Sequence, residues 1–453
     1  MKLPVLPRPA RAATKLAGGA IAVALLVTGC GSGSGSSGGS QQPAGLTSAD
    51  ALKDPTEPVT INYAGAAYSA DDIKPVLEAF HKEHPNITVN YQAVPFDQFN
   101  SVLSTRLSRK DTTLDLYDVD MPRTDAYQAR GWLTDLSKAF PDLAGKVDKT
   151  SLDAATSDGK LVAMPFQTSS QLLYYNKSLL KKAGIPFPSA KPADRPTWEA
   201  VTADAKKAQQ AGAKYGLVFD QVNRYYQLQP LAESLGGGSG AGGDKNLTPE
   251  LETAGWEKSM DWYSSLFKDK ISPRGVPVAQ TPDLFASGQV AFFPGGPWWG
   301  PKFAAESKLD FGVAAYPSFK GGKAVTPTGG WSLGLNPASK KAVASEIFMK
   351  FMGLDNGGFA QYMPSLAVPP SNTAGTASFY DEKIFKDPRM AGAVELTKYE
   401  LAHTATLRAR TTGYVEFEDT LSKTYEDISN GASVKSALSS ATSTINQAWA
   451  KYR

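Results

Sequence analysis

The stretch that decides the fold is residues 58–91, PVTINYAGAAYSADDIKPVLEAFHKEHPNITVNY. Apolar residues alternate with polar ones over residues 59–63, which predicts a strand. Over residues 73–84 the apolar side chains recur at the spacing of one helix face, and Ser69 or Asp71 can cap the start of that helix. Residues 87–91 alternate again. The stretch therefore predicts strand, helix and strand in succession.

The same order continues along the chain. Residues 99–107 carry a second helical face, and residues 114–119 predict a third strand, which ends beside Asp118 and Asp120. Strands that alternate with helices form right-handed crossovers and a mainly parallel sheet. Ligands gather outside the carboxyl ends of such strands. Asp120 is therefore a candidate ligand-binding residue.

The rest of the chain is more helical, with strands between the helices. Its pattern predicts helices near 198–211, 251–267 and 342–352, strands at 289–293, 311–315 and 331–335, and a last helical stripe from Ser433. A glycine-rich loop, residues 236–243, separates the first two of these helices. At 453 residues the chain is long enough for two or three domains. Periodicity alone predicts an α/β chain with two lobes.

Residues 1–29 have the pattern of an export signal. A basic beginning is followed by an apolar run, residues 16–27, that is shorter than the ~20 residues needed to span a bilayer. Val27-Thr28-Gly29-Cys30 resembles a bacterial lipobox, in which Cys30 would be the lipid-attachment residue; the alternative is a free thiol in an ordinary signal. Residues 30–57, rich in Gly and Ser near their start, fit a flexible tether. We expect a bacterial lipoprotein held on the extracellular face of the cell membrane.

Composition excludes several classes of function. One cysteine and three histidines disfavour a disulfide framework and a zinc enzyme. Four of the 47 basic residues lie in the first 29 positions, so 43 remain against 44 acidic residues, and the balance gives no reason to expect nucleic-acid binding. No Walker A loop and no His-Glu zinc motif occurs in the sequence. We therefore expect no cofactor, no metal and no nucleic-acid partner.

Aromatic residues in loops are the more informative signal. Residues 295–300, GGPWWG, place two tryptophans beside glycine and proline, where a regular core is hard to build. Trp331 follows Gly329 and Gly330, and two tyrosine pairs occur at 174–175 and 225–226. Flat aromatic rings suit the apolar faces of sugars, and neighbouring amides and carboxylates suit their hydroxyls. For any single aromatic residue, core packing remains the alternative.

At these residues the sequence resembles the maltose-binding-protein-like group of extracellular solute-binding proteins, which serve sugar ABC importers. The resemblance runs from about residue 58 to the end and rests on several blocks in family order: Gly131–Leu136 (GWLTDL), Asp158–Pro165 (DGKLVAMP), Leu173–Lys177 (LYYNK), Gly296–Trp298 (GPW) and Gly330–Leu335 (GWSLGL). The resemblance implies a two-lobed periplasmic-binding-protein-like α/β fold of the maltose-binding type, with a hinge of several strands and a ligand cleft between the lobes.

The resemblance also implies a division of the chain and a set of partners. Lobe one would comprise residues 58–155 and 326–368, and lobe two residues 156–325 and 369–453. The lobes would close on a sugar or oligosaccharide and deliver it to the transmembrane subunits of an ABC permease. We expect a monomer without catalytic residues.

Site residues follow from the resemblance, position by position. Thr411 departs from the proline that is usual in the family, which bears on the arginine just before it. Tyr226 is an alternative to its neighbour Tyr225. The residues expected to bind ligand are Tyr68, Asp120, Tyr175, Tyr225, Gly296, Trp298, Trp299, Gly330, Trp331 and Arg410.

Two other classes of function stay open. A secreted lipoprotein enzyme acting on glycans would need two carboxyl groups about 5 Å or 6.5–9.5 Å apart across one bond. Alternatively, the same fold could bind a non-sugar solute. A polyamine would require several acids among the aromatics, and a glycerophosphodiester would require arginines or a helix N-terminus.

Overall fold

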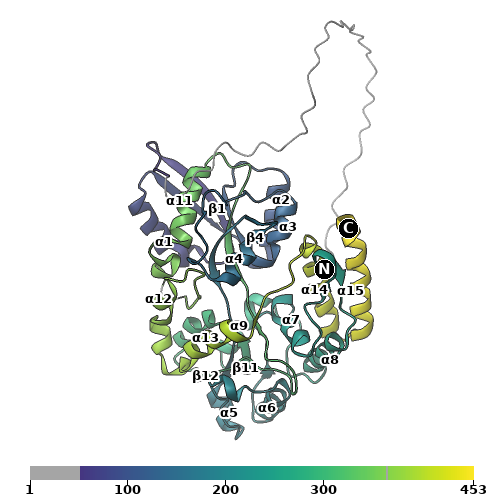
Figure 1. Cartoon of the computed structure of the whole chain (residues 1–453). Helices are drawn as coiled ribbons and strands as arrows, with labels where there is room; N and C mark the ends of the chain where they lie inside the picture. Colours follow the sequence, from purple (N-terminus) through teal and green to yellow (C-terminus); the bar gives the residue numbers. More distant parts are fainter. Residues whose placement is uncertain (1–51, 364–365) are drawn as a thin grey trace, which may run out of the picture. The chain divides into compact units, whose positions relative to one another are not determined.

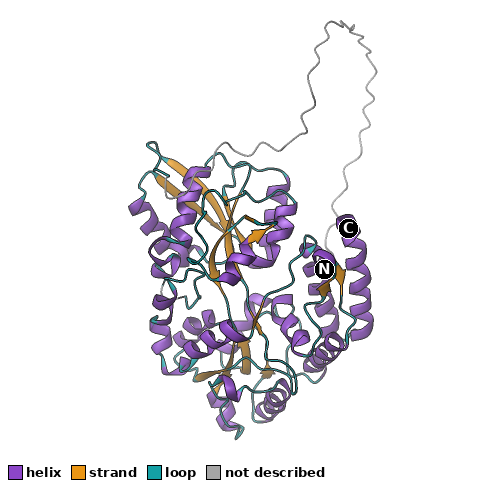
Figure 2. Ribbon diagram, in the orientation of Figure 1, coloured by secondary structure: helices purple, strands orange, loops and turns teal. Residues whose placement is uncertain are grey.

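The computed structural model describes residues 52–363 and 366–453, and its two larger β-sheets are separate from each other (Figures 1 and 2). The expected signal peptide, Cys30 and most of the tether lie outside the described residues. Within the described residues, no helix combines the length and the apolar character that crossing a membrane requires.

The first sheet has the strand order β2-β1-β3-β14-β6. Strand β1 pairs in parallel with β2 and β3, whereas β14 runs antiparallel to both β3 and β6. The parallel part agrees with the β-α-β-α-β pattern of the sequence, and the antiparallel strand is an addition. The strands are β1 (Val59–Gly65), β2 (Ile87–Ala93), β3 (Leu116–Asp120), β6 (Met164–Thr168) and β14 (Gly330–Leu335).

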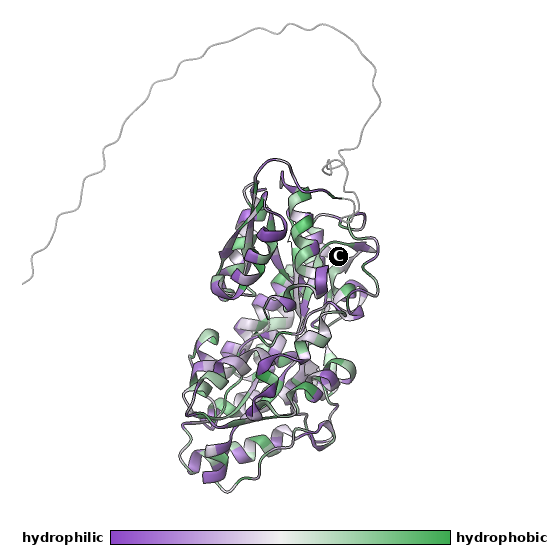
Figure 3. Cartoon of the chain, turned by 90° about the vertical axis from the view of Figure 1, so that its left-hand side faces the viewer, coloured by the Kyte–Doolittle hydropathy of each residue, from purple (hydrophilic) through white to green (hydrophobic). Residues whose placement is uncertain are grey.

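Amphipathic helices accompany this sheet. Helix α1 (Ala70–Glu83) begins at Ser69, whose hydroxyl accepts a hydrogen bond from the Asp72 amide while the Asp72 carboxylate accepts one in return. Helices α2 (Phe96–Ser108) and α11 (Ala342–Gly353) also pack on this sheet. The hydropathy colouring of Figure 3 shows that apolar and polar residues share the same helices, as expected for helices with one buried face.

The second sheet has the strand order β12-β7-β11-β8. Strand β11 pairs in parallel with β8 and antiparallel with β7. The carboxyl ends of β8 and β11 and the amino end of β7 therefore share one edge. The strands are β7 (Leu172–Asn176), β8 (Tyr215–Leu217), β11 (Val290–Gly295) and β12 (Phe311–Ala314). The main helices are α6 (Trp198–Gln210), α7 (Tyr225–Ser234), α8 (Ala254–Lys268), α13 (Ala393–His403), α14 (Tyr414–Ser429) and α15 (Val434–Trp449).

Each sheet has its own hydrophobic core. Ile61, Phe80 and Phe348 belong to a cluster around the first sheet, and Trp198 and Trp256 belong to a cluster around the second. Separate cores are the property of separate lobes. We call the part of the chain around the first sheet lobe one and the part around the second sheet lobe two. The two-lobed α/β fold expected from the sequence is confirmed.

The chain connects the lobes through short extended segments. Residues 169–171 lead from β6 into β7, and residues 328–329 lead from β13 (Thr326–Pro327) into β14. The Thr328 hydroxyl donates to the Ser169 carbonyl at 2.5 Å, which ties the two crossings together. Strand β6 belongs to the first sheet although it lies beyond residue 155, where lobe one was expected to end its first part. The exact lobe boundaries stay a prediction.

Candidate ligand-binding site

Three loops meet at the shared edge of the second sheet. The crossing segment 169–171 enters β7, Asp220 follows β8, and the Gly295–Trp299 loop follows β11. Tyr226, on the first turn of α7, joins them because its hydroxyl lies 3.0 Å from the Ser169 hydroxyl. Crevices outside the carboxyl ends of strands are the usual place for ligands in α/β sheets. This edge is the lobe-two part of the candidate site.

Buried polar atoms without partners gather at this edge. A buried polar atom with no hydrogen bond costs about 1–3 kcal/mol, and native proteins leave few of them. Ser170, Gln171 and Gln227 are each no more than 1% exposed, so water has little access to them. At this edge the atoms without a hydrogen-bond partner are Ser170 Oγ, Gln171 Nε2, Asp220 Oδ2, Gln227 Oε1 and Trp299 Nε1, and other unpaired buried atoms lie elsewhere among the described residues of both lobes. Such an edge can offer both donors and acceptors to a polar ligand.

Asp220 is the titratable member of this group. Burial raises the pKa of its carboxyl to about 7, and the nearby Trp299 N–H opposes that shift. The two groups lie near each other, yet neither satisfies the other in hydrogen-bond geometry. At neutral pH the Asp220 carboxyl can therefore act as a donor or as an acceptor.

On the lobe-one side, Asp118 holds the loop that follows β1. Its carboxylate accepts hydrogen bonds from the Tyr63 hydroxyl at 2.5 Å, the Ala66 amide at 2.8 Å and the Ala67 amide at 2.9 Å. Burial raises the pKa of Asp118 to about 6, although these three hydrogen bonds act in the opposite direction. Tyr68, next in this loop, donates its hydroxyl to Gln167. Tyr68 is thus buried within lobe one, with its own hydroxyl already engaged.

Asp120 ends β3 and reaches across to lobe two. Its two oxygens accept hydrogen bonds from Arg408 at 2.8 and 2.5 Å. The Arg408 guanidinium lies 5.1 Å from the centre of the Tyr226 ring. A Cβ on Gly329 would stand 3.0 Å from the Arg408 Nη2, so a glycine leaves room for the guanidinium beside the crossing. Through Arg408, Asp120 of lobe one is brought to the edge of lobe two.

Aromatic residues of lobe one form a wall near this point. Trp331 meets Phe96 edge-on at 6.1 Å and Phe99 at 6.0 Å between ring centres. Phe96 is 41% exposed, and the guanidinium of Arg224, from the start of α7, lies 5.3 Å from its ring centre. Gly330 is required here because a Cβ would stand 2.0 Å from the Gln167 carbonyl oxygen. Phe96 was not among the residues expected from the sequence.

The loop after β11 places Trp298 against lobe one. Trp298 is half-buried and packs on the apolar cluster of lobe one, although it belongs to a loop of lobe two. Gly296 permits this, since a Cβ there would lie 1.9 Å from the Trp298 ring. The neighbouring Trp299 turns instead toward Phe303, at 6.4 Å between ring centres, within lobe two. Trp298 therefore spans both lobes.

Three expected residues lie elsewhere. Tyr175 packs in the core of lobe two, 5.7 Å from Phe187 between ring centres. Tyr225 is fully buried and donates its hydroxyl to the Ser239 carbonyl at 2.5 Å. Arg410 forms an ion pair with Asp125 at 2.5 Å rather than meeting the lobe-two edge. Their assignment as ligand residues gains no support from these positions.

Tyr226, the alternative to Tyr225, and Arg408, two residues before Arg410, do lie at the lobe-two edge. Successive residues on a helix point about 100° apart, so one of two adjacent tyrosines enters the core and the other can face the site. Sequence reasoning also missed Asp220. Asp120 is the last residue of β3, whereas Asp220 lies beyond the end of the short strand β8, so the sequence carries no comparable signal for Asp220.

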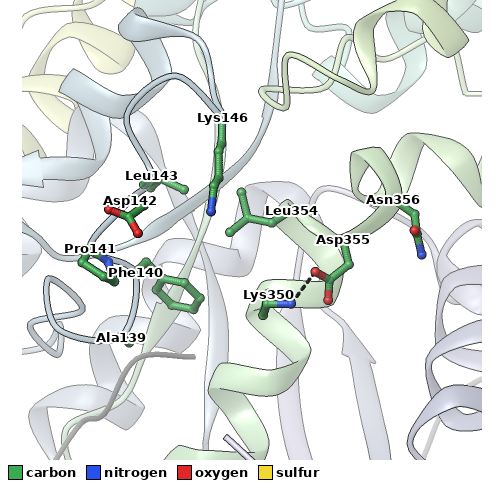
Figure 4. Close-up of a pocket in the computed structure, with 10 residues that line it drawn as sticks. All are labelled: Ala139, Phe140, Pro141, Asp142, Leu143, Lys146, Lys350, Leu354, Asp355 and Asn356. Carbon is green, nitrogen blue, oxygen red and sulfur yellow. Dashed lines mark hydrogen bonds and ion pairs between the residues drawn. The ribbon is translucent and has the colours of Figure 1, made fainter. Parts of the chain in front are cut away.

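Two hollows open elsewhere on the molecule. The first has a volume of about 220 Å³ in lobe one and is lined by Phe140, Asp142, Lys146 and Asp355, among others (Figure 4). The second, of about 240 Å³, lies in lobe two beside Tyr263 and Arg274. Neither lining includes a residue expected to bind ligand. Among residues 52–363 and 366–453, no three His, Cys, Asp or Glu side chains are placed to hold a metal ion.

Comparisons with known proteins agree with the fold. A binding protein of Brucella abortus is 29% identical over 268 residues, which are 56% of this chain and 62% of that protein. The maltodextrin-binding protein MdxE of Bacillus subtilis is 26% identical over 281 residues, 60% of this chain and 63% of that protein. The matched segment thus spans about three fifths of the length of these relatives.

A solved structure covers more of the chain. An ABC substrate-binding protein of Listeria monocytogenes, in complex with cycloalternan, superposes with a TM-score of 0.76 at 22% identity, covering 86% of this chain and 99% of that one. At this identity the likeness concerns the fold. The family model for bacterial extracellular solute-binding proteins matches residues 66–357, which is more than half of the chain. The chain belongs to the bacterial extracellular solute-binding protein family.

Proposed function

We propose that this protein is a membrane-anchored receptor that binds a neutral sugar or oligosaccharide between its lobes and delivers it to the transmembrane subunits of an ABC permease. The observation that carries the proposal is the lobe-two edge, where unpaired buried donors and acceptors lie beside aromatic rings. Sugars present hydroxyls, which both donate and accept, around faces that stack on aromatic rings.

Charge at the site favours a neutral ligand. Asp120 is paired with Arg408, and Glu418 of α14 is paired with Arg123. A polyamine would need unpaired carboxylates, because a buried charge without a partner is costly. A phosphodiester would need unpaired guanidinium groups, and beside Phe96 the guanidinium of Arg224 has no ion pair among the described residues. The remaining carboxyl, Asp220, has its pKa raised to about 7 by burial and so carries a partial charge at most near neutral pH.

Binding without reaction is part of the proposal. Hydrolysis of a glycosidic bond requires a general acid and a second carboxylate that faces the same bond. Both oxygens of Asp120 are held by Arg408, which disfavours a role as nucleophile or base. Asp220 alone is then left as a carboxyl at this edge. The protein would release its ligand unchanged.

The comparisons support the ligand class and the transport role. One relative is a maltodextrin-binding protein, and the Listeria protein is in complex with cycloalternan. Extracellular solute-binding proteins act outside the cytoplasm, and the lipobox-like sequence that ends at Cys30 would supply the membrane anchor. Delivery follows if the ligand contacts both lobes, since only then does it favour the closed form that a permease can recognise.

A ligand screen tests the proposal. The purified protein is heated with mono- and oligosaccharides, mannitol, spermidine and glycerophosphocholine, and the unfolding midpoint is recorded for each. A ligand that binds only the native state raises the midpoint. We expect a rise with a neutral sugar, which mass spectrometry then recovers intact. A rise with only spermidine or glycerophosphocholine, or a cleaved sugar, would refute the proposal.

A further inference from the structure

Four arginine–carboxylate pairs join two short stretches of the chain that belong to different lobes. Residues 120–130, which include the one-turn helix η2 (Met121–Arg123) and α3 (Thr124–Ala129), follow β3 in lobe one. Residues 408–418 lead into α14 in lobe two. The pairs are Asp120–Arg408 at 2.5 Å, Arg123–Glu418, Asp125–Arg410 at 2.5 Å and Arg130–Glu416 at 3.2 Å.

Two of these pairs form a charge ring of alternating sign, in which three sides are direct contacts and the fourth, between Asp120 and Arg123, is a longer-range attraction. Arg408 lies 3.7 Å from Glu418 as well as contacting Asp120, and Glu418 in turn contacts Arg123. The four side chains are between 3% and 12% exposed. Each lobe supplies one cation and one anion. Although burial alone would raise it, the pKa of Glu418 is held below its ordinary value by Arg123 and Arg408.

The ring has the energetics of a contact that can form and break. The attraction within a buried ion pair is largely offset by the loss of hydration, so each intact pair stabilises this arrangement of the lobes only modestly. Removal of one member has a different effect, because it leaves its partner buried without a counter-charge. A single substitution in the ring should therefore drive the lobes apart and expose the stranded charge to water.

Arg408 connects the ring to the candidate site. It holds both oxygens of Asp120, its guanidinium lies over the Tyr226 ring, and it passes beside Gly329 at a crossing between the lobes. The position of Asp120 relative to Tyr226 thus depends on this one side chain. Both residues border the proposed ligand.

We infer that Arg408 is a positioning residue that holds lobe one against lobe two through Asp120, and does so before any ligand binds. The interlobe contact is thereby set by the charge ring, and a ligand adds to it. This inference concerns the lobes of the protein alone; only its consequence for affinity rests on the proposed function.

Distance measurements between spin labels test the inference. Labels are introduced by Lys74→Cys in α1 and Lys258→Cys in α8, both exposed, in a Cys30→Ser chain that has no other cysteine. Without ligand, the parent should show one distance distribution, and Arg408→Gln should add a second, separate one. Arg408→Lys, which keeps the charge but loses the two-point contact, should give a smaller second population.

A matched control separates positioning from general destabilisation. Arg195 forms a buried ion pair with Glu400 at 2.9 Å, and both belong to lobe two. Arg195→Gln should lower the thermal midpoint yet leave the label distances unchanged. Identical distance distributions for Arg408→Gln and the parent would overturn the inference, and so would an equal second population in Arg195→Gln.

A second experiment adds maltotriose to the same labelled proteins and measures its affinity. If Arg408→Gln lowers the fraction of molecules in the parent's ligand-free arrangement about tenfold, and that arrangement is the one that binds, the apparent affinity should fall about tenfold as well. A parent protein that binds no sugar would count against the proposed function, while the ligand-free distances would still decide the inference. A shifted distance distribution with unchanged affinity would show that the ring lies outside the binding equilibrium and would overturn the role of Arg408 at the site.

Discussion

The two lobes present opposite kinds of edge to each other. On lobe one, Asp118 accepts three hydrogen bonds, the Tyr68 hydroxyl is engaged, and Asp120 has an arginine on both oxygens. On lobe two, Ser170, Asp220 and several neighbours keep unpaired buried atoms. Asp118, Tyr68 and Asp120 therefore give lobe one an edge whose carboxylates and hydroxyl are already engaged, although Ser332 Oγ of β14 is unpaired, while the edge of lobe two bears the cost of several polar groups that a ligand can satisfy.

The difference has a thermodynamic consequence. Where hydrogen bonds are complete, a substitution should cost stability, because each lost acceptor leaves its donors unpaired. Where they are incomplete, removal of the polar group should leave stability unchanged or improve it, and the loss should fall on binding. The sign of the stability change thus distinguishes the two edges.

The largest expected effect is on the saturated edge. Asp118→Ala removes the acceptor of the Tyr63 hydroxyl and of two loop amides, and should lower the free energy of unfolding by about 3–5 kcal/mol. Denaturant unfolding followed by circular dichroism measures it. Asp142→Ala, at an exposed carboxylate of the same lobe, should change the value by less than about 0.5 kcal/mol. Equal values for the two variants would contradict the assignment.

Asp220 should give the next largest effect, as a function of pH. Burial raises its pKa to about 7, so between about pH 4 and pH 7 the folded protein binds more protons than the unfolded chain, and stability falls as the pH rises. Between pH 5 and pH 8 this group alone should cost the wild type about 2–3 kcal/mol.

Asp220→Asn removes that titration. Between pH 5 and pH 8 the free energy of unfolding of the variant should fall by about 2–3 kcal/mol less than that of the wild type. Asp118, Glu346 and Glu382 have raised pKa values too and keep part of the slope in both proteins. Parallel curves for the wild type and the variant would show that Asp220 titrates normally.

The fold was predictable where the pattern is local. Short local patterns predict strands at residues 59–63, 87–91 and 114–119, which lie at 59–65, 87–93 and 116–120, and the parallel order follows from the helices between them. No local sequence pattern predicts that β14 lies between β3 and β6. Its position depends on where the chain re-enters lobe one after the long segment that forms lobe two.

The site was predictable only in part, for the same reason. Asp120 became a candidate because its sheet could be inferred, whereas Asp220 required knowledge that β8 is parallel to β11. The sequence alone does not distinguish Tyr226 from Tyr225, because packing against other elements decides which face of the helix turns inward. The charge ring could not be foreseen either, since its members lie almost 300 residues apart.

Trp298 tests the contact between the two edges. It comes from lobe two, packs on lobe one and remains partly exposed, so Trp298→Ala should weaken sugar binding by about 1–3 kcal/mol with little change in the thermal midpoint. Trp262→Ala, in the core region of lobe two, should lower the thermal midpoint and leave the affinity for sugar nearly unchanged. Calorimetric titration measures the affinity, and a change of less than twofold for Trp298→Ala would remove this residue from the site.

The smallest effect belongs to Ser170, and its sign is the informative part. Ser170 is 1% exposed with an unpaired hydroxyl, so Ser170→Ala should raise the free energy of unfolding by up to about 1 kcal/mol while weakening sugar binding by a similar amount. Ser345→Ala removes an equally unpaired hydroxyl from α11, away from both edges, and should stabilise without changing affinity. A Ser170→Ala protein that is less stable than the wild type would mean that the hydroxyl already has a partner. The unsaturated edge would then be as complete as the edge of lobe one, and the asymmetry between the lobes would disappear.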